Sequence, residues 1–288
     1  MTIKTILVPL SEPGLVKTSL QAAFKLAGPF AAHIEALHVR PDPQMAAASL
    51  MGEAMSGAMI DQIIKDGIKR SAANAVKTRQ AFEQVCKAAG IAYSEKPQRA
   101  SRTTAAWREE IGYEDHVLIS RARVVDLIVL PRPLSQIDVA GRLSLEAALM
   151  ETGRPLLLAP PKLPSKIGSK IAIAWNGSAE AARAVSEARP FLLAARQVTI
   201  LTAAEPQSED PNPAGLQTQL AWQGIKARID KLRTSGDIGK ALLKAAERVG
   251  ADLLVMGGYS HSRVRELILG GVTRHVLSEA TIPVFMVH

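Results

Sequence analysis

Residues 253–278 read LLVMGGYSHSRVRELILGGVTRHVLS, and the order of elements in this stretch decides how the whole chain is interpreted. A short apolar run of strand length is followed at once by Gly257 and Gly258, then by a basic loop. A second glycine pair, Gly270 and Gly271, leads into a helical pattern. Glycine lets a backbone approach a phosphate, and a helix N-terminus offers free N–H groups. This order predicts an anion site formed by backbone N–H groups. With equal weight, it indicates glycines that only allow tight turns of the chain.

The composition is that of an ordinary globular protein. The 288 residues are enough for about two domains, and 47% are hydrophobic against 22% charged. The single cysteine, Cys86, excludes an intramolecular disulfide and a cysteine-cluster metal site. Because Cys86 lies in a helical pattern, a buried inert thiol is favoured over a nucleophile. No metal site is predicted.

The net charge of +8 permits weak attraction to polyanions, but the basic residues are scattered among carboxylates. Aromatic residues make up only 4%, which leaves no stacking platform for single-stranded nucleic acid. No apolar run approaches the roughly 18 residues of a membrane helix, and the first apolar stretch is too short for a signal peptide. We therefore expect a cytoplasmic protein with neither nucleic acid nor a membrane as its partner.

The first half of the chain alternates between strand and helix patterns. Buried strands are expected at residues 5–10, 33–39, 126–130 and 155–159, with a weaker candidate at 92–97. Helices are expected at 15–26, 113–122 and 140–150. The long alanine-rich stretch 45–90 predicts one or two helices. Its methionines (Met45, Met51, Met55 and Met59) indicate core packing or a subunit contact.

A proline-rich linker, residues 160–169, separates this pattern from a second copy. Strands are then expected at 171–174, 198–203, 225–232, 252–256 and 283–287, with helices at 179–194, 215–224 and 238–249. The strands of the two copies follow one another in the same order. The first copy has additional residues, which fall in its methionine-bearing region. The simplest account is two βα domains in tandem, residues 1–160 and residues 170–288.

The chain resembles a tandem protein of the universal stress protein family over nearly its whole length. The opening ILVPL, the second-half IAIAWNGS and GADLLVMGGY are similar to the family's first and fourth strands. Nucleotide-binding members of the family carry G-x2-G-x9-G-[ST] after the fourth strand. Here Gly257 and Gly270 keep the spacing, whereas Ser260 replaces the second glycine and Gly271 the hydroxyl residue. Thr273 could supply a hydroxyl instead.

The resemblance implies an α/β fold with two doubly wound, Rossmann-like, five-stranded parallel sheets of order 3-2-1-4-5. In such a sheet a ligand lies where the winding reverses, between strands 1 and 4. We therefore expect ATP or ADP to bind the second domain. The site residues expected are Ala174, Asn176, Ala203, Met256, Gly257, Ser260, Gly270, Gly271, Val272 and Thr273. We also expect Gly257→Val to abolish nucleotide binding and to leave folding largely intact.

The first domain is expected not to bind nucleotide in this manner, because Pro131 and Pro133 each lack a backbone donor. Ser11 also stands where the family has an acidic residue. The resemblance implies that the domains pair through their last strands as an intramolecular pseudo-dimer, with a homodimer as a further option. Three hypotheses stay open: a stress-response or signalling protein that binds adenine nucleotide, a nucleotide-independent interaction or scaffold protein, and an enzyme acting on bound nucleotide. No catalytic residues are predicted, because no nucleophile elbow or P-loop is present.

Overall fold

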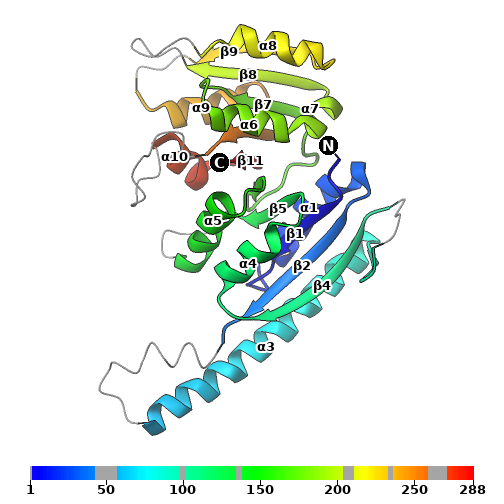
Figure 1. The fold of residues 1–288 in the computed structure, drawn as a ribbon, viewed down its shortest axis with the longest axis vertical. Coiled ribbons are helices and arrows are strands. Elements are labelled where there is room, and N and C mark those ends of the chain that lie inside the picture. Colours follow the sequence, from blue (N-terminus) through cyan, green and yellow to red (C-terminus); the bar gives the residue numbers. More distant parts are fainter. Residues whose placement is uncertain are drawn as a thin grey trace.

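The computed structural model describes residues 2–42, 57–97, 102–133, 138–203, 211–232, 236–258 and 271–288, with the side chains of residues 139 and 140 left aside. Eleven strands of the described residues form one sheet in the order β3-β4-β2-β1-β5-β6-β11-β10-β7-β8-β9 (Figure 1). Within these residues no helix is long and apolar enough to cross a membrane.

The described residues of the first half form six strands and five helical segments. The strands are β1 (Thr5–Pro9), β2 (His33–Arg40), β3 (Ala92–Tyr93), β4 (Thr104–Ile111), β5 (Leu127–Pro131) and β6 (Leu156–Ala159). The helices are α1 (Val16–Ala27), the short η1 (Gly28–Phe30), α3 (Gly57–Ala89), α4 (Glu114–Ala122) and α5 (Val139–Glu151). Apart from the edge strand β3, the order is the predicted 3-2-1-4-5.

The second half repeats this plan in a shorter form. Its strands are β7 (Lys170–Ala174), β8 (Gln197–Ala203), β9 (Ala227–Leu232), β10 (Leu253–Gly257) and β11 (Val284–Val287). Its helices are α6 (Ala179–Glu187), α7 (Arg189–Ala194), α8 (Pro213–Trp222), α9 (Ile238–Arg248) and α10 (Gly271–Glu279). The strand order again matches the prediction, and all pairs within this half are parallel.

The two halves meet through their last strands, which pair antiparallel with Phe285 opposite Leu157. This confirms the predicted pairing of residues 155–159 with 283–287. All four residues of each of these strands are buried. A strand that is buried on both faces reads as a continuous apolar run, as LLLA and VFMV do. The predicted pair of sheets is therefore one continuous sheet.

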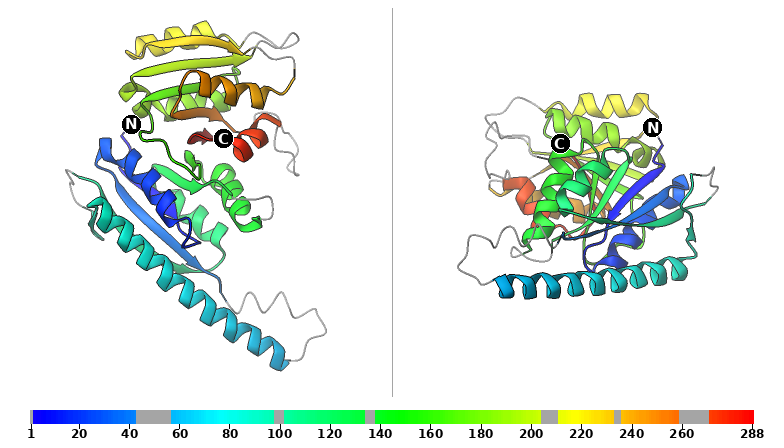
Figure 2. Two further views of the ribbon diagram at one scale, coloured as in Figure 1. Left: turned by 180° about the vertical axis from the view of Figure 1, so that it is seen from behind. Right: turned by 60° about the horizontal axis from the view of Figure 1, so that its bottom comes forward.

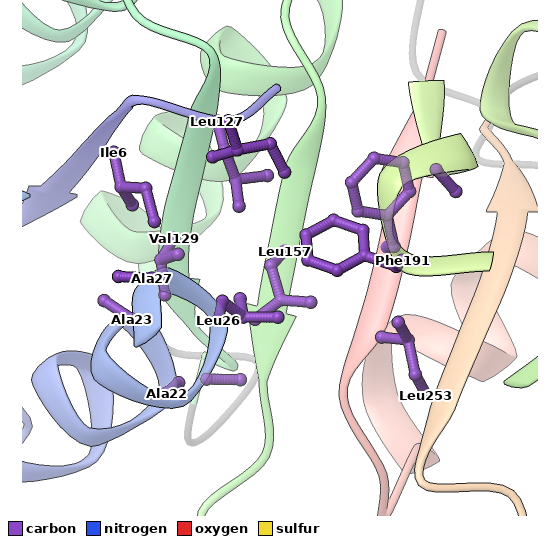
Figure 3. Close-up of a cluster of buried hydrophobic side chains, with 14 of the residues drawn as sticks. Ile6, Ala22, Ala23, Leu26, Ala27, Leu127, Val129, Leu157, Phe191 and Leu253 are labelled. Atoms are coloured by element: carbon purple, nitrogen blue, oxygen red, sulfur yellow. The ribbon is translucent and has the colours of Figure 1, made fainter. Parts of the chain in front are cut away.

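Helices cover both faces of the sheet, and each face has one core that runs through both halves (Figure 2). On one face Ile6, Val129 and Leu157 of the first half join Phe191 and Leu253 of the second (Figure 3). Phe191 packs edge-on against Phe285, with ring centroids 5.8 Å apart. Because the apolar contacts cross from β6 to β11, the halves share their hydrophobic burial.

An aspartate before the fourth strand fixes the start of the first strand in each half. The Asp126 carboxylate accepts hydrogen bonds from the backbone N–H groups of Lys4 (2.7 Å) and Thr5 (2.9 Å). The Asp252 carboxylate accepts from Gly168 (2.9 Å) and Lys170 (3.0 Å). Burial raises the pKa of Asp252 against the lowering effect of these donors. The repeated DLIVL and DLLVM motifs thus join strands that are distant in sequence.

The weak strand candidate at 92–97 was largely wrong. Only Ala92–Tyr93 is a strand, and the third long strand of the first half is β4, which the sequence analysis missed. β4 pairs with β2 along its whole length, but its last four residues are not buried. The helix expected over 179–194 is also split into α6 and α7, with Pro190 in the first turn of α7.

Candidate functional site

The carboxyl ends of β7, β8 and β10 meet where the winding of the second half reverses. Ala174 ends β7 and lies opposite Met256 on one side and Leu201 on the other. Ala203 ends β8, which places it on the same edge of the sheet. Three of the expected site residues therefore lie at the ends of neighbouring strands: Ala174 and Ala203 are the last residues of β7 and β8, and Met256 is the last but one of β10. This is the position at which open α/β sheets bind their ligands.

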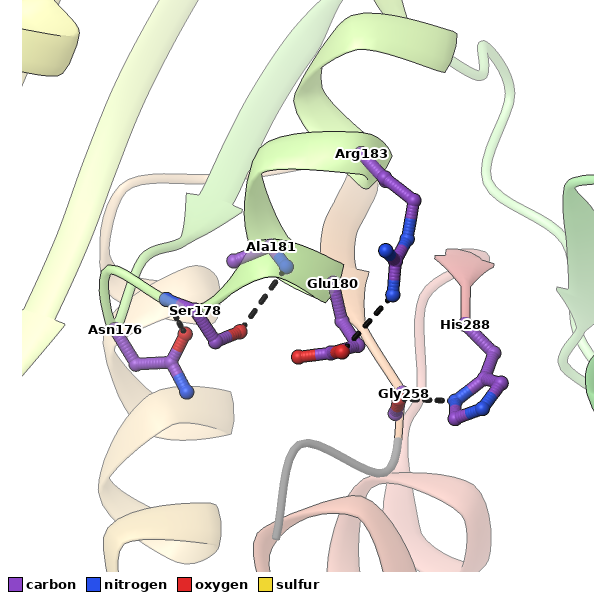
Figure 4. A network of polar contacts seen from close by, with 7 residues as sticks. All are labelled: Asn176, Ser178, Glu180, Ala181, Arg183, Gly258 and His288. Carbon is purple, nitrogen blue, oxygen red and sulfur yellow. Dashed lines mark hydrogen bonds and ion pairs between the residues drawn. The ribbon is translucent and has the colours of Figure 1, made fainter.

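The turn from β7 to α6 carries the polar groups nearest this edge (Figure 4). Asn176 is exposed, and its side-chain oxygen accepts a hydrogen bond from the Ser178 N–H at 3.1 Å. The Ser178 hydroxyl caps α6 by accepting from the Ala181 N–H at 3.2 Å. Gly177 has φ +76°, and a Cβ there would lie 3.2 Å from Pro211 Cα. The turn is thus held in a shape that requires glycine.

Trp175 closes one side of this turn. Its indole N–H donates to the Pro211 carbonyl at 2.5 Å, just before the start of α8. The adjoining hydroxyl of Thr202 is buried, and no described group is its hydrogen-bond partner. A buried hydroxyl without a partner is uncommon and costs stability. Thr202 was missed by the sequence analysis, since a threonine inside a β-rich run carries no distinguishing signal.

Gly257 packs against the first turn of α6. A Cβ built on Gly257 would lie 2.5 Å from the Ala181 backbone N and 2.6 Å from the Glu180 carbonyl carbon. Backbone atoms cannot move aside as a flexible side chain can. The expectation that Gly257→Val leaves folding intact is therefore wrong, because the glycine is required for close contact between strand and helix.

Gly258 lies on the opposite face of the strand, towards the first half. A Cβ there would lie 3.0 Å from Leu149 Cδ2 of α5. The Gly258 N–H donates to the Val287 carbonyl at 2.8 Å, and its own carbonyl lies 3.2 Å from His288 Nδ1 (Figure 4). The second glycine of the pair thus serves the contact between halves.

An ion pair that was not predicted from the sequence, Glu180 with Arg183, lies at the N-terminus of α6. Glu180 lies in its first turn and pairs with Arg183 at 2.9 Å, with the Glu180 side chain only 18% exposed (Figure 4). A carboxylate at a helix N-terminus is stabilised by the helix dipole. The acidic first turn of AEAAR was the available signal. This charge makes the N-terminus of α6 a poor anion site.

The N-terminus of α10 is the other end of the expected site. Gly271 is exposed, and a Cβ there would meet no atom of the described residues within 4 Å. Val272 is half-buried, and Thr273 is only 6% exposed. Ser260 and Gly270 lie outside the described residues, as does the basic loop between them, which contains His261, Arg263 and Arg265. In the described part, backbone N–H groups at the start of α10 are therefore better placed for an anion than the Thr273 hydroxyl.

The matching position in the first half is an acidic cavity of about 70 Å³. It lies at the carboxyl ends of β1 and β5 and includes Ser11, Glu12, Asp138 and Arg132 in its lining. Glu114 accepts hydrogen bonds from the Ser11 hydroxyl at 2.6 Å and the Ser144 hydroxyl at 3.0 Å. From sequence, this half was expected to pack against the second half, and no pattern indicated the cavity.

The Arg132 guanidinium does not serve this cavity as an anion partner. Its Nη1 donates to the carbonyls of Ser278 (2.8 Å) and Ala280 (3.0 Å), at the C-terminal end of α10. The Pro131–Arg132–Pro133 segment at the end of β5 thus contacts α10, the helix whose N-terminus borders the expected nucleotide site. Among the described residues no group of three or more histidine, cysteine or carboxylate side chains could hold a metal ion.

Comparison with known proteins identifies the family of the second half. Residues 169–288 match the model of the universal stress protein family. The second half is a universal stress protein domain. The chain is also 29% identical over 145 residues to the universal stress protein Slr1230 of Synechocystis. That match spans about half of this chain and about half the length of the relative.

Solved structures show that the likeness in fold extends over both halves. A universal stress protein from Archaeoglobus fulgidus superposes with a TM-score of 0.64 at 17% identity, covering 98% of this chain and 97% of that one. A putative universal stress protein from Pseudomonas aeruginosa gives a TM-score of 0.57 at 17% identity, covering 99% and 93%. At these identities the comparison shows a shared fold.

Proposed function

We propose that this universal stress protein comprises two domains, residues 1–160 and 170–288, and that the second binds an adenine nucleotide, ATP or ADP. The meeting of Ala174, Ala203 and Met256 at the switch point carries this proposal. Two of these three side chains are a single methyl group, so the edge of the sheet leaves room for a flat ring. The point where the winding of an open α/β sheet reverses, here called the switch point, is the usual place for a ligand in this class of fold.

The phosphates would lie at the start of α10. Gly271 is open on its side-chain face, and the helix N-terminus contributes N–H donors and a positive dipole end. Asn176 lies at the opposite side of the edge, in the exposed turn after β7. An amide can bond a ribose hydroxyl as donor or acceptor. The role of the protein would be nucleotide-dependent stress response or signalling.

Substitutions at Gly271 test the phosphate position without touching the core. Gly271→Asp adds a carboxylate at a helix N-terminus, which the helix tolerates but a phosphate does not. We expect the ATP affinity measured by titration calorimetry to fall at least about tenfold, which is about 1.4 kcal/mol. Gly271→Ser restores the family's hydroxyl and should raise the affinity. Equal affinities for wild type and both variants would contradict the assignment.

A nucleotide-independent interaction protein is the second candidate. It is favoured by Gly257 and Gly258, whose missing side chains are both explained by packing against α6 and α5. Native mass spectrometry of the purified chain, followed by calorimetry with ATP, ADP and AMP, separates the two functions. Absence of binding at millimolar nucleotide would favour the interaction protein.

A further inference from the structure

Helix α3 is packed on the sheet along only part of its length. Its buried residues, Ala75, Thr78, Phe82 and Cys86, all lie in the C-terminal half. Between residues 57 and 74, all of them described, no residue is buried. Figure 1 shows this N-terminal part of α3 extending beyond the ends of β2 and β4. The corresponding helix of the second half, α8, has only 10 residues and no such extension.

The projecting part continues the apolar face of the packed part. Among its half-exposed positions, Ile60, Ile64, Gly67 and Ser71 recur at intervals of three and four residues and lead directly to Ala75, and Ala72 and Asn74 are half-exposed beside them. Ile63 and Ile68 flank this line and are 39% and 42% exposed. The apolar stripe, defined here as residues 60, 63, 64, 67 and 68, would be core if a partner covered it.

Charged residues along the stripe identify the kind of partner. Asp61 precedes Lys65 by one helical turn on one flank, and Asp66 precedes Arg70 by one turn on the other. In two antiparallel helices related by a two-fold axis, the same flanks lie side by side and run in opposite directions. With the two-fold axis near residue 63, Asp61 of one helix faces Lys65 of the other, and Gly67 lies near Ile60 of the partner subunit. The Asp61 flank is then complementary to itself, whereas Asp66 and Arg70 contact each other within one helix.

We infer that two copies of this chain associate through residues 57–74 of α3, packed antiparallel. Gly67 lies between Ile64 and Ile68 in the stripe and leaves a recess for an isoleucine of the partner subunit. Eighteen residues of helix are about 27 Å long. A pair of such helices buries less than the roughly 1,600 Å² of a standard interface, so the dimer should be reversible with a micromolar Kd. The inference is independent of nucleotide binding.

Sedimentation velocity between about 1 and 100 µM tests the association directly. Wild-type protein should shift from monomer towards dimer across this range. The double variant Ile64→Glu with Ile68→Glu should stay monomeric, with Kd raised at least tenfold. Val76→Glu is the matched control, because Val76 is 56% exposed on the same helix but lies away from the stripe. It should dimerise as wild type does.

Charge reversal tests the antiparallel orientation. Asp61→Lys places two bases on one flank and should weaken the dimer, whereas Asp61→Lys combined with Lys65→Asp should restore it. Ile64→Cys provides a covalent readout, since burial raises the pKa of Cys86 to about 12 and keeps that native thiol unreactive. Oxidised Ile64→Cys should give a disulfide-linked dimer, and Val76→Cys should not.

Three results would overturn the inference. The first is a monomer at every concentration. The second is a dimer that the stripe variants leave unchanged, which would place the interface elsewhere. The third is a monomer whose Tm falls in the stripe variants, which would show that other residues of the same chain cover the stripe.

Discussion

The two switch points of this protein share a topology and differ in almost every chemical respect. In the first half, Ser11 follows β1 and the Pro131–Arg132–Pro133 segment ends β5, around an acidic cavity. In the second half, Asn176 follows β7, Gly257 ends β10 and Gly258 comes directly after it. Identical strand order thus carries carboxylates at one switch point and glycines with a helix N-terminus at the other. The fold determines where a site can form, and the few residues after each strand determine what can enter.

The same positions also differ in how they join the halves. The Arg132 guanidinium donates a hydrogen bond to the C-terminal end of α10. Gly258, one residue beyond β10, instead packs against the Leu149 side chain of α5. One contact is polar and the other apolar. The contact between halves is therefore asymmetric although the strands β6 and β11 pair almost symmetrically. Each switch point thus makes a different contribution to holding the halves together.

The largest expected effect follows from replacing the glycine at the second switch point. Gly257→Val forces a side chain into the backbone of α6, and overpacking of this kind costs up to about 3 kcal/mol. Urea unfolding should show this loss. Gly271→Ala is the matched control, because a Cβ there meets open space. Unfolding at the wild-type urea concentration in the Val variant would show that α6 does not pack as described.

Most of this architecture could be predicted from the sequence, because buried parallel strands read as short apolar runs. That signal is present in TILVP, LIVLP and LLVMG. The repeat of DLIVL as DLLVM indicated that the two halves have the same order of elements. β4 was missed because its TAAWREEI is apolar only in its first half, where burial is complete. A period of two is hard to see when a strand is covered along only part of its length.

The candidate site was only partly predictable for a different reason. The residues at strand ends, such as Ala174 and Met256, follow from topology. The contacts of Gly257 with α6 and of Arg132 with α10 depend on how closely distant segments approach, which no local pattern encodes. For Gly257 the phosphate interpretation and the packing interpretation predict the same residue, so only the structure could choose between them.

The second expected effect concerns the polar contact between halves. Arg132→Met keeps an apolar stem and removes the donor to Ser278 and Ala280, so two helix-end carbonyls lose a charged partner. Hydrogen bonds to charged groups contribute about 1.5–3 kcal/mol, and we expect a loss of about 2 kcal/mol in the free energy of unfolding. Arg132→Lys should restore part of it. Full stability in the methionine variant would show that the contact contributes nothing.

A comparable test applies to the acidic cavity of the first half. Glu114→Ala leaves the hydroxyls of Ser11 and Ser144 without their acceptor, at a cost of about 1–2 kcal/mol. Glu114→Gln keeps an acceptor oxygen and should cost less than the alanine variant. Thermal unfolding of both variants measures the difference. Equal losses would mean that the two hydroxyls turn to other acceptors.

The smallest expected effect is a pH dependence confined to the first half. His33 begins β2 and bonds the Thr104 hydroxyl at 2.9 Å, while Gln197 begins β8 at the matching position. Burial lowers the pKa of His33, assisted by Arg108 and opposed by Glu35. A lowered pKa favours the neutral imidazole in the folded state. The stability it contributes is present above the ordinary value of 6.5 and is lost as the pH falls through that value towards the lower folded pKa.

His33→Gln gives the first half the residue of the second and removes this titration. We expect the free energy of unfolding of the wild type to fall more steeply between pH 7 and pH 5 than that of the variant, as measured by urea titrations at matched ionic strength. Carboxylates titrate in both proteins and cancel in the difference. Parallel curves would mean that the His33 imidazole gains a proton as readily in the folded chain as in the unfolded one. The difference between the two strand starts would then be one of sequence without consequence for acid stability.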